Sequence, residues 1–143
     1  MRFVPFFLLL LLIAGCAHDD SRLHGTWYSN REATVAAAFE RDPRWTNATP
    51  AKLKQFKDIF GHMSITYSSD IATTDFRGKV ESFRYHVMRR GPDYVVIHTD
   101  TQIDKNRDRR ITFVDGGTGY WIDIGALGLG MRERFDRIQN RRP

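Results

Sequence analysis

Met63-Ser64-Ile65-Thr66-Tyr67-Ser68 and Phe83-Arg84-Tyr85-His86-Val87-Met88 decide the fold class of this chain. In both stretches large apolar residues alternate with mostly polar ones, a period of two that is typical of strands with one buried face. Three more short apolar segments follow, at residues 94–99, 111–114 and 120–124. Turn signals separate them at Gly91-Pro92-Asp93, Asp104 to Asp108, and Gly116 to Gly119. The pattern predicts an antiparallel meander.

The alternation also predicts which side chains form the core of this meander. The candidates are Phe83, Tyr85, Val96, Ile111, Phe113, Tyr120 and Ile122. The last periodic segment, residues 131–138, fits two structures: Met131, Glu133 and Phe135 alternate as in a strand, but Phe135 and Ile138 also share a helix face.

Two helices are predicted between a first strand at residues 25–29 and the meander. Ser29 and Glu32 fit a capping box for a short helix through residues 33–39, which Pro43 ends. The second helix has Thr49 as N-cap, Pro50 at its first position and Gly61 as its stop. Its apolar face is predicted to pack on the sheet and carries Leu53, Phe56, Ile59 and Phe60.

The first sixteen residues have the layout of a secretory signal peptide. Arg2 precedes an apolar run through Ile13, and two small residues then lead to Cys16, the only cysteine. The run is about 12 residues, whereas a membrane-spanning helix needs roughly 20. A plain signal peptide cleaved near Ala17 is one interpretation. The other, which we favour, starts from the small-small-Cys ending, which resembles the lipobox of bacterial lipoproteins.

That resemblance implies removal of residues 1–15, a diacylglycerol on the Cys16 sulfur and an acyl chain such as palmitate on the new amino group. Ala17, where an Asp would retain an enterobacterial lipoprotein in the inner membrane, implies a protein on the outer membrane that faces the periplasm. Residues 16–24 are then a lipidated tether, and residues 25–143 one β-domain. The net charge of +5 suits a solvated surface. Nucleic-acid binding is not expected, because an exported protein is separated from the nucleic acids of the cell.

Gly25-x-Trp27 on a first strand, followed by the meander, resembles the lipocalin and calycin barrels. The resemblance implies that an arginine from the last strand stacks over Trp27, and Arg132, Arg134 and Arg137 are available. Arg132-Glu133-Arg134-Phe135 also looks like the ending of small bacterial lipocalin-like proteins. Because only six or seven strands are evident, the fold predicted is mainly β (α+β): a small or partly open antiparallel barrel with a two-helix insert after strand 1.

Two patterns invite a metal-site interpretation, and neither is adopted. Asp104, Asn106, Asp108 and Asp115 match part of a calcium loop, but Arg109 replaces the required glycine and several cations crowd the segment. A polar hairpin turn is expected there. His86 and His98 face each other only if paired residues sum to 184, and no third ligand stands at a characteristic spacing.

No motif in the chain points to catalysis. The glycine-rich residues 125–130 do not have phosphate-loop spacing, and no serine sits in a Gly-x-Ser-x-Gly elbow. The sequence therefore predicts a non-catalytic binding or envelope-interaction module without a cofactor. Its expected partners are the membrane, through the lipid anchor, and a small apolar ligand or an envelope protein. The alternatives are an immunity or inhibitor protein against an envelope-acting toxin or hydrolase, and an enzyme of unknown class.

Overall fold

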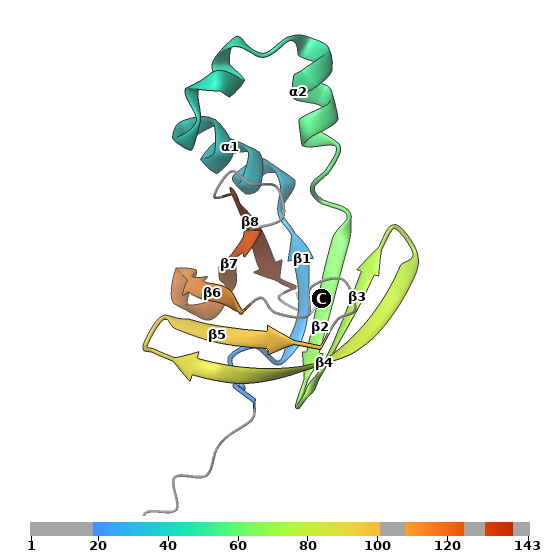
Figure 1. The fold of residues 1–143 in the computed structure, drawn as a ribbon, viewed down its shortest axis with the longest axis vertical. Helices are drawn as coiled ribbons and strands as arrows, with labels where there is room; N and C mark the ends of the chain where they lie inside the picture. The colour runs from blue at the N-terminus through green and yellow to red at the C-terminus, as the bar shows by residue number, and fades with distance from the viewer. Residues whose placement is uncertain (1–18, 101–107, 125–130, 139–143) are drawn as a thin grey trace, which may run out of the picture.

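The chain folds into a closed, all-antiparallel β-barrel of eight strands (Figure 1). The computed structural model describes residues 19–100, 108–124 and 131–138. Each strand pairs with the next along the chain, and β1 pairs with β8 to close the barrel. The strands are β1 (Gly25–Ser29), β2 (Met63–Ser68), β3 (Ile71–Phe76), β4 (Lys79–Arg90), β5 (Tyr94–Thr99), β6 (Arg109–Val114), β7 (Gly119–Ile124) and β8 (Met131–Arg137).

The helices lie between β1 and β2, and together they cover one end of the barrel (Figure 1). They are α1 (Arg31–Arg41), the 3₁₀ helix η1 (Pro43–Asn47) and α2 (Pro50–Lys57). A second 3₁₀ turn, η2 (Asp115–Gly117), joins β6 to β7. Within the described part of the chain, no helix combines the length and apolar character needed to cross a bilayer. The mainly-β class and the two-helix insert are as predicted.

The strand count differs from the prediction because β3 was not recognised in the sequence. Its residues on the inward face are small or polar, with Ala72 and Thr74 taking places that large apolar residues occupy elsewhere. A tight turn at Arg77 and Gly78, both with positive φ, then returns the chain into β4. With this strand included the sheet closes completely, so the barrel is neither partly open nor six- or seven-stranded.

The helix ends differ in part from the predicted ones. Asn30, not Ser29, caps α1, since its side chain accepts a 2.9 Å hydrogen bond from the Ala33 amide. Thr49 caps α2 and Pro50 is its first residue, as predicted. That helix ends at Lys57 rather than near Gly61, because the chain turns at the next residues before it enters β2.

The barrel interior holds the larger of two apolar clusters. Of the predicted core residues, five are buried in it and Phe83 packs at its margin. Val96 is buried as well, but it lies outside this cluster because its neighbours Val95 and Ile97 take the inward positions of β5. The cluster consists of Leu23, Trp27, Ile65, Tyr67, Ala72, Tyr85, Val95, Ile97, Ile111, Phe113, Tyr120, Ile122 and Phe135. Residues 131–137 form a strand, so of the two structures that fitted this segment the strand is correct and the helix is not.

The smaller cluster joins the helices to the end of the barrel. It contains Val35 from α1, Phe56 and Phe60 from the second helical segment, and Met131 from β8. The ring of Phe56 lies 4.0 Å from that of Trp45 and 5.3 Å from that of Phe60, centroid to centroid. Because Ile59 is 48% exposed, only part of the predicted apolar face of this segment is buried.

Candidate functional site

The end of the barrel opposite the helices is closed around Trp27. This residue is fully buried, and its indole nitrogen donates a 2.6 Å hydrogen bond to the Leu23 carbonyl oxygen. The Arg137 guanidinium carbon lies 4.4 Å from the centroid of the indole ring. Trp27 and Arg137 are also opposite each other in the pairing of β1 with β8. Of the three available arginines, Arg137 therefore lies over Trp27, while Gly25, with a φ of 111°, begins the strand.

The segment before β1, residues 19–24, is docked against this same end of the barrel. Leu23 is fully buried and Asp20 is only 6% exposed. The Arg22 guanidinium donates to the carboxylate of Asp20 at 2.8 Å and to the carbonyl oxygens of Gly91 and Pro92 at 2.9 and 2.8 Å. The Arg22 hydrogen bond holds the pKa of the Asp20 carboxyl below its ordinary value. The predicted tether is thus fixed to the barrel from residue 19 onward, while Cys16 lies outside the described residues.

Three tyrosines meet inside the barrel. Burial raises the pKa of Tyr67 to about 12, and it raises those of Tyr85 and Tyr120 as well. The Tyr85 hydroxyl has no hydrogen-bond partner among the described residues, whereas the Tyr120 hydroxyl interacts with that of Tyr67. All three phenols are protonated near neutral pH, so they do not supply a phenolate base or nucleophile.

Aromatic rings fill much of the space between the described strands. The centroids of Trp27 and Tyr120 are 4.7 Å apart, and that of Phe135 is 5.2 Å from Tyr120. Tyr67 packs edge-to-face on Tyr85 at 5.2 Å. This is the packing of a small barrel filled by its own side chains, rather than that of a wide ligand cup.

A carboxyl group also faces the interior at the helical end. Glu133, from β8, accepts a hydrogen bond from the Ser29 hydroxyl, which in turn accepts one from the Gly61 amide at 2.9 Å. Burial raises the pKa of Glu133. The carboxyl group therefore favours its neutral form more than an exposed glutamate does.

Arg132 and Arg134 lie on the outer face of β8, on either side of Trp121 in β7. Their guanidinium carbons are 5.3 and 5.7 Å from the centroid of the indole ring. Arg134 is held by two carboxylates, Asp115 at 2.5 Å and Asp136 at 2.6 Å. Trp121, Arg132 and Arg134, together with Arg41 at the end of α1, are called the Trp121–arginine surface below.

Arg132 is the least satisfied member of this surface. Its Nε is buried without a hydrogen-bond partner among the described residues. Burial lowers the pKa of its guanidinium, and the positive charge of Arg41 lowers it further. Arg41, Trp45 and Arg132 line a cavity of about 30 Å³ beneath α1. This volume is room for about one water molecule. The site therefore places guanidinium groups beside aromatic rings, while Asp123, opposite Arg132 in the strand pairing, and Asp42 in the cavity lining offset part of their positive charge. The guanidinium groups can donate charge-assisted hydrogen bonds to an acidic group.

The candidate metal ligands do not assemble in the part of the chain that the structure describes. Asp104 and Asn106 lie outside it, Asp115 pairs with Arg134, and Asp108 accepts a 3.0 Å hydrogen bond from the His98 ring. His86 and His98 are directly opposed, in the register that sums to 184, with ring centroids 5.1 Å apart. No group of three potential ligands forms around a common point among the described residues.

The sequence did not predict that residues 19–24 dock on the barrel, nor that Arg41 lies beside Arg132. The segment has no periodicity, and its partners at Gly91 and Pro92 are about seventy positions away. The one feature of the sequence that indicates the Trp121–arginine surface is the Arg-x-Arg spacing at residues 132–134, because this spacing puts both guanidinium groups on one face of a strand.

The chain matches no family model, no curated protein and no solved structure. Its eight-stranded closed antiparallel barrel is consistent with a calycin-like fold. Functional inference therefore rests on the geometry of this molecule.

Proposed function

We propose that this chain is a lipid-anchored, non-catalytic binding module of the bacterial envelope. In this proposal Cys16 carries the lipid, and the domain is held on the outer membrane, facing the periplasm. The leader sequence supports export and acylation. The Arg137–Trp27 contact at the junction of β1 and β8 supports a lipocalin-like domain, since that closure is what the resemblance implies.

The Trp121–arginine surface is the proposed binding site, and the two guanidinium groups whose carbons lie 5.3 and 5.7 Å from the centroid of the Trp121 ring are the observation that carries it. A guanidinium that is partly desolvated and next to a second one gains most from an incoming carboxylate, because charge-assisted hydrogen bonds are strong where water is excluded. Tryptophan and arginine are also the residues that most often dominate the energy of protein interfaces.

The proposed partner is an envelope protein that presents acidic side chains. The aromatic packing inside the barrel argues against a large apolar ligand there. An acidic protein partner also fits the second candidate function, an immunity or inhibitor protein that neutralises an envelope-acting toxin or hydrolase.

The anchor is tested with Cys16→Ser. We expect an unacylated precursor that no longer fractionates with membranes, because a cleaved lipoprotein depends on its acyl chains for stable attachment. Normal maturation and unchanged detergent partitioning of this variant would rule out the lipid anchor.

The binding site is tested by a photo-crosslinking amino acid placed at Asp123, an exposed residue opposite Arg132 in the pairing of β7 with β8, in the native, membrane-bound protein. We expect one discrete cross-linked protein, with a yield that falls about tenfold or more in Arg132→Glu, since like charges brought together at an interface cost several kcal/mol. Lys79→Glu, which makes the same charge change on the exposed β3–β4 hairpin, is the matched control. Equal yields in both variants would contradict the assignment of this surface.

A further inference from the structure

The outward face of β4 is strongly basic. From Ser82 to Arg90 the strand carries three arginines and one histidine but no acidic residue. A β-bulge between Val87 and Arg89 shifts the register by one, which returns Arg89 to the face that Arg84 and His86 share. Met88 is 52% exposed beside it. We call Arg84, Met88 and Arg89 the β4 basic face.

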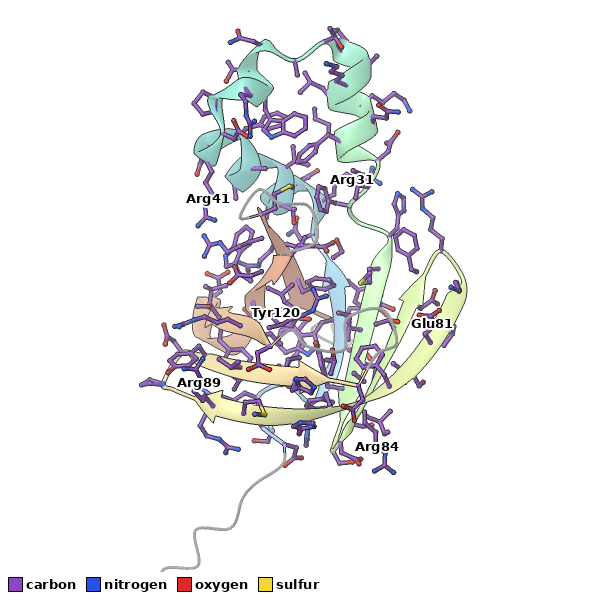
Figure 2. The ribbon with its side chains drawn as sticks, viewed as in Figure 1. Arg31, Arg41, Glu81, Arg84, Arg89 and Tyr120 are labelled. Atoms are coloured by element: carbon purple, nitrogen blue, oxygen red, sulfur yellow. The ribbon has the colours of Figure 1, made fainter. Side chains whose placement is uncertain are left out.

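This face lies at the end of the molecule from which the chain leads back to Cys16. The Arg90 guanidinium donates a 3.0 Å hydrogen bond to the carbonyl oxygen of Asp19, which fixes that residue beside the end of β4. Figure 1 shows the first described residues beneath β4, at the opposite end from the helices. Figure 2 shows Arg84 and Arg89 at this same end and Arg41 close to the helices.

The distance from Asp19 to the proposed lipid is short. Two residues lie between Cys16 and Asp19, and the three steps of an extended chain span at most about 3.6 Å each, or roughly 11 Å in all. Acyl chains on Cys16 would therefore bring the bilayer surface within about one layer of headgroups of this end of the barrel. A long flexible tether would let the barrel take any orientation relative to the membrane, whereas this short connection keeps the end that carries Asp19 near the bilayer.

We propose that the β4 basic face lies on an anionic phospholipid surface, with the helices pointing away from the membrane; the inference rests on the proposed acylation of Cys16. Arginine suits phosphate groups because its planar guanidinium donates two parallel hydrogen bonds. Met88 supplies an apolar side chain to the headgroup boundary between them. Asp70, whose carboxylate lies 4.0 Å from the Arg84 guanidinium, offsets part of the positive charge of this face.

The orientation is tested with thiol labels on the full acylated protein in vesicles. Because acylation consumes the only native thiol, Met88→Cys and Ile59→Cys each provide a single labelling site, one on the β4 basic face and one on the helical end. In phosphatidylcholine vesicles containing phosphatidylglycerol, we expect bilayer-embedded quenchers to quench the label at residue 88 and not the one at residue 59. Equal quenching of the two labels would overturn the proposal.

The electrostatic part is tested with Arg84→Gln/Arg89→Gln in the Met88→Cys background. Each arginine near an anionic surface favours binding by roughly fivefold, so the double variant should shift the balance between docked and free orientations by about 25-fold. Quenching should then approach that in pure phosphatidylcholine. Lys52→Gln/Lys57→Gln on α2 removes the same charge from the helical end and should leave quenching unchanged.

The two levels of the proposal fail differently. A protein that does not stay with vesicles at all refutes the lipid anchor. A protein that is anchored, but whose residue 88 label is as exposed to water as that at residue 59, refutes only the orientation. Quenching that is unaffected by the double arginine variant refutes the role of anionic lipid.

Discussion

The two ends of this barrel are closed by different physical means. At one end, residues 19–24 are held by hydrogen bonds, a carboxylate–guanidinium pair and the Arg137 contact on Trp27. At the other, α1 and α2 are held by apolar side chains around Phe56. The first closure depends on charge and geometry, so it responds to pH and to single-atom changes. The second depends on buried area, so it responds to the size of its side chains.

The largest effect is expected at the Trp27 end, where the polar closure meets the main core. Trp27→Ala should lower the free energy of unfolding by about 3–5 kcal/mol, because it removes a fully buried indole and leaves a cavity. Tyr28→Ala, next in sequence but 43% exposed, is the control and should cost much less. Urea titration measures both. A loss below about 1 kcal/mol in the Trp27 variant would mean that this end contributes little to the barrel.

A smaller effect is expected at the helical end. Phe56→Ala should cost at most about 3 kcal/mol, since the smaller cluster can open locally while the barrel stays folded. Amide hydrogen exchange should therefore accelerate in α1 and α2 much more than in β5 and β6. Uniform acceleration in helices and strands would show that the two ends unfold as one unit.

The polar closure should give stability a specific pH dependence. The folded-state pKa of Asp20 lies below its ordinary value of 3.8, so its pair with Arg22 contributes stability above the unfolded-state pKa, and this contribution is lost as pH falls through the folded-state pKa. We expect Asp20→Asn to cost about 1–2 kcal/mol at pH 7 and nearly nothing well below pH 3. Asp42→Asn is the comparison on the helical side: Arg44 also lowers the pKa of Asp42, but this pair lies at the surface, so its pH dependence should have the same sign and be smaller. An equal pH dependence in wild type and Asp20→Asn would contradict the role of this pair.

The smallest effect, and the one of opposite sign, is expected for Glu133. Its pKa is raised by burial, so the ionised form that prevails at higher pH is less stable in the folded protein than in the unfolded chain. Its stabilising contribution is present below the unfolded-state pKa and is lost as pH rises through the folded-state pKa. Glu133→Gln keeps an acceptor for the Ser29 hydroxyl, so it should raise the unfolding free energy at pH 7 by up to about 1 kcal/mol. Thermal melts at pH 5 and pH 8 check this, and a variant less stable than wild type at pH 8 would contradict it.

The sequence alone determined the class of the fold and most of its elements. Alternation identified β2 and β4, and short apolar segments between turn signals identified β5, β6 and β7. The sequence also indicated β1 and, as one of two alternatives, β8, but it did not indicate β3. Thr49 and Pro50 fixed the start of α2, because these signals act within a few residues of chain. The resemblance to the lipocalin barrels limited the arginine partner of Trp27 to three residues of the last segment, Arg132, Arg134 and Arg137. β3 was missed because its inward residues Ala72 and Thr74 do not give the apolar alternation that reveals a strand.

Only the tertiary structure decided how the barrel closes and what surfaces it presents. Arg137 rather than Arg132 lies over Trp27 because the pairing of β1 with β8 sets the register, and no local rule fixes a register between segments about 110 residues apart. The docking of residues 19–24 depends in the same way on carbonyl groups of a distant turn. The Trp121–arginine surface combines side chains from α1, β7 and β8, which come together only in the folded chain, whereas the arginines of the β4 basic face share one strand and are brought onto one face by its bulge. Local patterns encode secondary structure, but contacts between distant segments determine where side chains meet.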